Sequence, residues 1–270
     1  SEFSGLAWWR DTLVLLPQHP ERFDNNVFVL ERGVIEAFLD GSSTEPLRVR
    51  RVPLVAPIVE TFAYDGFEAI AFTGDRVYVS IEARRGDTDI VGRLLCGRVE
   101  GDLERILIDA EPSATLEAQN DLENTGYEAI VVRAEQLIAI YETNGGVNES
   151  PRALLFDRNL RPMGAMPMAH LQYRVTDASE IDERGRFWVA NYHWPGAPWE
   201  NSSCELTDRY GQGESHRRCA SVERLVELEV RDEGIAPTDR APVQLELVDD
   251  AHARNWEGLV RLGDRGFLMV

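Results

Sequence analysis

Three short segments of the sequence place a glutamate at the same point of a repeated pattern. In residues 66–70 and 126–130, a glycine is followed by an aromatic residue, a glutamate, an alanine and an isoleucine, and residues 255–259 follow a similar order. The glutamates are Glu68, Glu128 and Glu257. Carboxylates at equivalent points of successive structural repeats can converge on one centre, where several oxygen ligands suit a hard cation such as Ca²⁺.

Each glutamate is followed by a polar turn and a short apolar run, which is typical of a β-hairpin. Residues 77–82, 137–142 and 267–270 form these runs. The pattern also fits residues 4–9 leading into 13–16, and residues 179–181 leading into 187–190. The sequence therefore predicts five repeats, whose equivalent positions are Ser4, Glu68, Glu128, Ser179 and Glu257.

The repeats predict an all-β fold. Each has room for about four strands, and four-stranded repeats around a channel are the blades of a β-propeller. We therefore expect a single domain over residues 1–270, a five-bladed β-propeller whose last blade is incomplete in this sequence. Further strands are predicted at 27–30, 105–108, 225–230 and 243–247, and a polar insertion loop at about 194–221. A β-sandwich is the alternative fold, but it would not explain the repeated glutamates.

Composition limits the partners of the protein. The net charge is -19, and every Lys or Arg position is an arginine. An acidic chain is unsuited to the backbone of nucleic acids or to an anionic membrane surface, but it is compatible with binding cations. The sequence has no apolar run of the ~20 residues that span a bilayer. We expect no nucleic-acid partner and no membrane insertion.

The cysteines predict one disulfide. Cys204 and Cys219 flank the most polar part of the insertion, and a bridge between them would close a loop of about 15 residues. Such a bridge would indicate a secreted or periplasmic protein, whereas free thiols would leave the location open. Cys96 lies in an apolar run and is predicted to be a buried thiol.

The five equivalent residues are the predicted metal ligands. In a propeller they would ring the mouth of the channel, where carboxylates raise one another's pKa and a divalent cation removes the repulsion. The alternative is that the glutamates accept hydrogen bonds from backbone amides where the inner strands begin. A bound Ca²⁺ could also serve only to hold the blades together.

The ends of the second strands should surround the same channel mouth. They carry a mixture of charged and polar side chains: Gln18, His19, Arg22, Glu82, Arg84, Arg85, Glu142, Asn144, Asn191, Tyr192 and His193. A histidine there is a candidate general acid or base, and a guanidinium is suited to an anionic group. The candidate catalytic residues are therefore His19, Arg84, Glu142 and His193. Alternatively, each is an ordinary surface side chain.

The order Ser, Glu, Glu, Ser, Glu, together with residues 256–259, resembles the calcium-activated nucleotidases, which are five-bladed propellers with an axial Ca²⁺. The chain is also similar to esterase-like propellers associated with some phytases. The resemblance implies a calcium-dependent hydrolase of phosphate esters or related esters, acting on a small anionic or ester substrate. The alternatives are a propeller that binds a ligand or protein, with calcium only structural, and a scaffold domain.

Overall fold

A computed structural model describes residues 3–85, 89–122, 125–197, 204–248 and 254–270, with the main chain only at residues 58, 84–85 and 89–90. Within these residues the strands form four antiparallel meanders and a final hairpin, which we call units 1 to 5. The last strands of units 1 and 2 pair in parallel, so these two units share one eight-stranded sheet. The fold is all-β, as the alternating apolar runs predict. Its helices are short: α1 (Arg32–Leu39), α2 (Glu205–Tyr210) and the 3-10 turns η1 (Pro20–Phe23), η2 (Pro57–Thr61), η4 (Ser215–Arg218) and η5 (Gly263–Arg265).

The strands of each unit follow one another in the chain. Unit 1 is β1 (Phe3–Trp9), β2 (Thr12–Pro17), β3 (Asn26–Glu31) and β4 (Arg50–Val55); unit 2 is β5 (Ala63–Thr73), β6 (Arg76–Arg85), β7 (Asp89–Glu100) and β8 (Arg105–Leu116). Unit 3 is β9 (Ala129–Arg133), β10 (Gln136–Ile140), β11 (Arg152–Asp157) and β12 (Pro162–Pro167); unit 4 is β13 (Arg174–Ala178), β14 (Arg186–His193), β15 (Val222–Arg231) and β16 (Gly234–Pro237), with β17 (Val243–Gln244) also pairing β15. Unit 5 is β18 (Leu259–Arg261) and β19 (Phe267–Met269).

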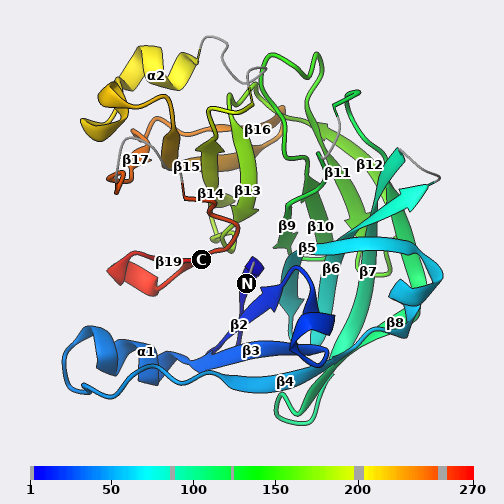
Figure 1. Ribbon diagram of the computed structural model, residues 1–270. Coiled ribbons are helices and arrows are strands. Elements are labelled where there is room, and N and C mark those ends of the chain that lie inside the picture. Colours follow the sequence, from blue (N-terminus) through cyan, green and yellow to red (C-terminus); the bar gives the residue numbers. More distant parts are fainter. Residues whose placement is uncertain (1–2, 86–88, 123–124, 198–203, 249–253) are drawn as a thin grey trace.

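Apolar residues join the units in a closed cycle. Unit 1 packs on unit 2 around Val14 and Val79, and the next two interfaces have the same character. Trp188 of unit 4 contacts unit 5, whose Val260 packs on Leu6 of unit 1. Figure 1 shows the units arranged around a common centre, where both termini lie. Burial of both faces of the sheets explains why the strands read as apolar runs.

The first strands of all five units line one cavity of about 260 Å³. Ala7, Ile70, Val131, Ala178 and Val260 each contribute to its wall. Since each of them lies in the first strand of its unit, these strands face the centre of the cycle. Among the described residues, no helix is long and apolar enough to cross a membrane.

Candidate functional site

Glu68 lies at a β-bulge in β5, whereas Glu128 and Glu257 lie just before β9 and β18. Phe67 and Ala69 of β5 pair with successive residues of β6, so Glu68 between them is an extra residue in the ladder. Ser4 takes the same place in β1, between Phe3 and Gly5. A bulge redirects a side chain that would otherwise alternate with its neighbours. The bulges therefore direct Ser4 and Glu68 away from the regular sheet.

Five carboxylates influence one another near the beginnings of these strands. We call them the carboxylate cluster: Glu68, Glu82, Glu128, Glu142 and Glu257. Burial, and next the carboxylate of Glu82, raise the pKa of Glu68 well above its ordinary value, and a hydrogen bond from Gln18 opposes the rise. Burial, Glu68 and Glu142 raise the pKa of Glu128 in the same way. Protein atoms closely surround the Glu128 carboxylate, yet the residue as a whole is only half-buried by surface area. Water therefore reaches it and moderates the repulsion between Glu128 and the other carboxylates.

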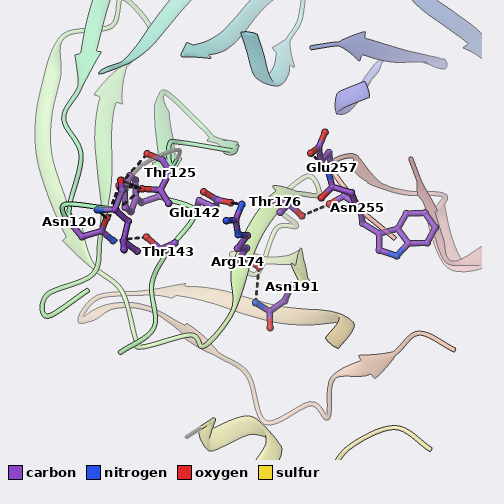
Figure 2. A network of polar contacts seen from close by, with 12 residues as sticks. Asn120, Thr125, Glu142, Thr143, Arg174, Thr176, Asn191, Asn255 and Glu257 are labelled. Atoms are coloured by element: carbon purple, nitrogen blue, oxygen red, sulfur yellow. Dashed lines mark hydrogen bonds and ion pairs between the residues drawn. The ribbon is translucent and has the colours of Figure 1, made fainter. Parts of the chain in front are cut away.

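Arg174 brings a positive charge to the cluster. Its Nη1 donates to Glu142 Oε1 at 2.7 Å, and the Glu142 side chain is only 3% exposed. The main chain holds the pair together, because the Val175 amide donates to the Glu142 carbonyl at 2.9 Å. Figure 2 shows Glu142 and Arg174 between the polar loop around Asn120 and the segment that carries Glu257. Arg174 supplies the charge that a buried carboxylate requires.

Two glycines leave room for the clustered side chains. A Cβ at Gly126 would lie 2.6 Å from Glu82 Oε1, and one at Gly66 would lie 2.8 Å from Glu68 Oε1. Both contacts are shorter than carbon and oxygen can make without displacement. The glycine of the repeated motif therefore makes space for a carboxylate.

The structure places the two predicted serine ligands differently. Ser4 is fully buried, and its hydroxyl has no hydrogen-bond partner in the described part of the chain. Ser179 lies beyond the end of β13, accepts a hydrogen bond from the Trp188 amide at 3.0 Å and donates to the Glu180 carbonyl at 3.2 Å. It lines the central cavity, which Glu68, Glu128 and Glu257 do not.

Strand pairing identifies Thr176 as the residue of unit 4 that matches Glu68. It is the extra residue between Val175 and Asp177 of β13, and its hydroxyl donates to the Trp256 carbonyl. By the same alignment Arg174 takes the place of Gly66. The hairpin between β13 and β14 is longer than the one between β5 and β6. The sequence pattern assigns the equivalent position by its distance from the turn, and in this longer hairpin that distance leads to Ser179 instead of Thr176. Residues 174–178 share no residue with 66–70 at equivalent positions, so the sequence carried no signal for either one.

The predicted catalytic residues do not all meet. Glu142 belongs to the carboxylate cluster, whereas His19 pairs with Glu21 at 3.1 Å and packs edge-on against the Tyr64 ring. His193 is 1% exposed and stacks on Tyr173, with ring centroids 5.2 Å apart. The side chain of Arg84 lies outside the described part of the structure. The cluster and Arg174 are therefore the centre of the candidate site.

The predicted metal requires rearrangement of these side chains. Within the described residues, no group of three or more His, Cys, Asp or Glu side chains is arranged to hold an ion. The clustered groups nevertheless offer carboxylate oxygens. The hydroxyl of Ser4, the predicted ligand in β1, is buried and has no hydrogen-bond partner among the described residues. Such a donor set suits a hard cation.

The predicted disulfide is absent, because Cys204 and Cys219 are both free thiols. Each sulfur has another partner: Arg224 Nη2 donates to Cys204 at 3.2 Å, and the Ser221 amide donates to Cys219 at 3.4 Å. The Arg224 guanidinium helps to lower the pKa of Cys204 against the effect of burial, which raises it. Cys96 is a buried thiol, as predicted.

The comparisons with known proteins concern the fold. No protein-family model matches the chain, and no curated protein matches it in sequence. A GH43_1 enzyme from Xanthomonas citri complexed with xylose aligns with 98% of this chain and 80% of its own, at 8% identity and a TM-score of 0.50. A glucose dehydrogenase (99% and 92%, 11% identity, TM-score 0.48) and the soluble aldose sugar dehydrogenase of Escherichia coli (100% and 92%, 9%, 0.45) are also similar.

The GH43_1 enzyme is β-propeller-like, and its likeness agrees with the cycle of antiparallel units in this all-β chain. At such low identity the likeness extends to the fold alone. The resemblance to calcium-activated nucleotidases stays a prediction.

Proposed function

We propose that the protein is a five-bladed propeller that binds Ca²⁺ at the carboxylate cluster and hydrolyses a phosphate ester or a related ester beside it. One observation carries the proposal: five carboxylates from three units meet where they raise the pKa of Glu68 and Glu128. Arg174 contributes one cation to this cluster, through Glu142. Further positive charge would remove the remaining repulsion.

In this proposal Glu68, Glu128 and Glu257 hold the ion, with Ser4 at the matching point of β1. Ser179 is part of the predicted ligand set, but its hydroxyl is already hydrogen-bonded within its own hairpin. A bound Ca²⁺ would neutralise the carboxylates and polarise a substrate oxygen. The side chains of the glutamates would have to turn toward the ion, which their flexible stems permit.

The residues of the chain itself can divide the remaining chemistry. The guanidinium of Arg174, 22% exposed, can hold an anionic oxygen of the ester. In hydrolysis, water adds to the phosphorus or carbonyl centre while the bond to the leaving oxygen breaks. The leaving oxygen then takes its proton from water or from a carboxyl group of the cluster that does not hold the ion, because Glu128 would lose its proton on binding Ca²⁺. The free thiols of Cys204 and Cys219 leave the location of such an enzyme open, so a secreted or periplasmic protein stays a prediction.

A propeller that only binds a ligand or protein is the second candidate. The burial of two predicted catalytic residues favours it, because His193 is 1% and Glu142 2% exposed, and Glu142 is already paired with Arg174. In that case calcium would stabilise the fold without taking part in a reaction.

The proposal is tested by calcium titration followed by a substrate panel. We expect Ca²⁺ to raise the melting temperature of the wild-type protein, as binding to the native state requires. Glu68→Gln and Glu128→Gln should weaken this response, whereas Glu149→Gln, at an exposed position outside the cluster, should not. A wild-type melting temperature indifferent to calcium and chelator would refute the metal site.

Activity is then measured on nucleotides, phosphate monoesters and simple esters, with and without Ca²⁺. Arg174→Ala should reduce turnover while much of the calcium-dependent stabilisation remains, because Arg174 is not placed as a ligand. Calcium-dependent stabilisation without turnover on any substrate would favour the binding protein over the hydrolase.

A further inference from the structure

A second, larger cavity lies outside the carboxylate cluster. It has a volume of about 790 Å³ and is enclosed by η1, the end of β4, η2 and the beginning of β5. Cavities that take small organic ligands are typically of this size and mostly apolar, with a few polar groups that set specificity. Nothing in the proposed calcium chemistry makes use of it.

One wall of the cavity is aromatic and held in place. It consists of Phe62, Tyr64 and Phe67. The Tyr64 and Phe67 rings pack edge to face with centroids 5.5 Å apart, and Phe67 is 2% exposed. The Tyr64 hydroxyl donates to the Gln18 carbonyl at 2.7 Å, so the ring has little freedom to turn. A wall that is already ordered loses little entropy when a ligand binds.

The charged groups of the cavity are carboxylates. Glu21 and Glu60 line it, and both are exposed at its rim. Glu21 also pairs with His19 at 3.1 Å, which leaves Glu60 as the rim carboxylate without a described histidine beside it. No lysine, arginine or histidine is among the described lining residues. Arg93 lies over the Phe62 ring at 4.8 Å but donates to Thr115 and does not line the cavity.

Burial, and then the charges of Glu21 and Glu68, raise the pKa of Tyr64, which therefore stays a neutral phenol at physiological pH. An aromatic wall and two carboxylates both attract a positive charge, whereas they repel an anion.

We propose that this cavity binds a small organic cation: an ammonium group on an aromatic or aliphatic body. The body would lie against the aromatic wall and the apolar side chains of Leu54 and Val59, and the ammonium group would face Glu21 and Glu60. This site is separate from the calcium site, and its failure would leave the calcium proposal intact.

The test compares three probes of similar shape and different charge. Binding of 2-phenylethylammonium, 2-phenylethanol and phenylacetate is measured by calorimetry or by ligand-observed NMR at low salt. We expect the ammonium compound to bind at least about threefold more tightly than the alcohol, as cation–π and carboxylate contacts at a partly exposed site imply. Phenylacetate should bind most weakly. Equal affinity for the ammonium compound and the alcohol would overturn the assignment of charge.

Variants then locate the site. Ala63, exposed on the cavity wall, can be replaced by tryptophan to fill the space with little disturbance of the core. Ala63→Trp should abolish binding of all three probes while the circular dichroism spectrum and melting temperature stay near those of wild type. Unchanged binding in this variant would show that the probes bind elsewhere and overturn the proposal.

A charge-matched pair of double variants tests the rim. Glu21→Gln with Glu60→Gln should remove most of the preference for the ammonium compound and leave the affinity for the alcohol unchanged. Glu45→Gln with Glu149→Gln changes the net charge equally at exposed positions that do not line the cavity, and should keep the preference. If both double variants lose the preference equally, the net charge of the protein causes it and the proposed site is wrong.

Discussion

Replacing Asp177 with alanine should weaken the closure of the cycle of units. Asp177 is 2% exposed, and its carboxylate accepts backbone N–H groups from three strands. The amides of Leu259 and Ala178 donate to it at 2.7 Å, and the amide of Leu6 at 3.4 Å. One side chain of unit 4 thereby holds the beginnings of unit 5 and unit 1 together.

The expected loss follows from these contacts. A buried N–H left without an acceptor costs about 1–3 kcal/mol, so the two short bonds together amount to about 2–6 kcal/mol. Burial of the carboxylate is itself unfavourable, as the raised pKa of Asp177 shows, and its removal offsets part of this loss. We expect Asp177→Ala to lower the free energy of unfolding by about 2–3 kcal/mol at pH 7.

Urea unfolding measures this change, with Asp157→Ala as the matched control. Asp157 also accepts two backbone N–H groups, from Asn159 at 2.8 Å and Arg161 at 2.9 Å, but within one solvent-accessible turn. Its loss should cost less than about 1 kcal/mol. Faster hydrogen exchange at the Leu6 and Leu259 amides should accompany the Asp177 change. If both variants lose the same stability, the carboxylate has no special part in joining the units.

The pH dependence has a definite sign. The pKa of Asp177 is higher in the folded protein than in the unfolded chain, so the native state holds the carboxyl proton more tightly. The contribution of Asp177 to the free energy of unfolding therefore decreases as pH rises from the unfolded pKa through the folded pKa. The difference between wild type and Asp177→Ala should therefore grow when the pH is lowered from 7 toward 4. A difference that shrinks on acidification would contradict the direction of the shift.

Three further predictions concern the candidate site, and a fourth concerns the contact between Glu223 and Trp256. In the presence of chelator, Glu128→Gln should raise the melting temperature at pH 8 more than at pH 5. The raised pKa of Glu128 makes the ionised carboxylate increasingly unfavourable in the native state as pH rises. An equal change in melting temperature at both pH values would contradict this. Calcium binding to the wild type should release protons, detected by calorimetry in buffers of different ionisation enthalpy, and Glu128→Gln should release fewer. Gly126→Ala should displace the Glu82 carboxylate and weaken calcium-dependent stabilisation, whereas an unaltered calcium response would place Glu82 outside the site. Glu223→Gln removes the charge that accepts the Trp256 indole N–H at 2.7 Å, so urea unfolding should show a loss of about 2 kcal/mol and the tryptophan fluorescence should shift.

The repeated hairpins could be predicted because each is a local pattern. A glutamate, a polar turn and an apolar run identify β5 with β6, β9 with β10, and β18 with β19. The strands at 27–30, 105–108 and 225–230 lie within β3, β8 and β15. The run 243–247 forms only the short β17, because it pairs with β15 over two residues and then leaves the sheet.

Features that depend on pairing between distant residues could not be predicted in the same way. The position of Thr176 follows from the register of β13 against β14, which a longer turn conceals. Arg174 reaches Glu142 from another unit, and no spacing in the sequence links the two residues. The positions of the two loop cysteines suggest a bridge between them. In the structure, however, Cys204 lies against Arg224, whose guanidinium also donates to Asn191.

Asp177 and the clustered glutamates differ in the groups that donate hydrogen bonds to them, and this difference helps to decide between a structural and a functional role for the glutamates. One explanation of the repeated glutamate is that it accepts backbone amides where an inner strand begins. Asp177 does this in unit 4, with three such bonds. Glu68 instead accepts a side-chain hydrogen bond from Gln18 at 3.5 Å, and no described backbone amide donates to Glu68 or Glu128. A fold that satisfies the buried Asp177 carboxylate with its own amides does not do so at Glu68 or Glu128. Unfavourable charge kept together in this way is expected of a site that binds a cation or moves a proton, rather than of a purely structural contact.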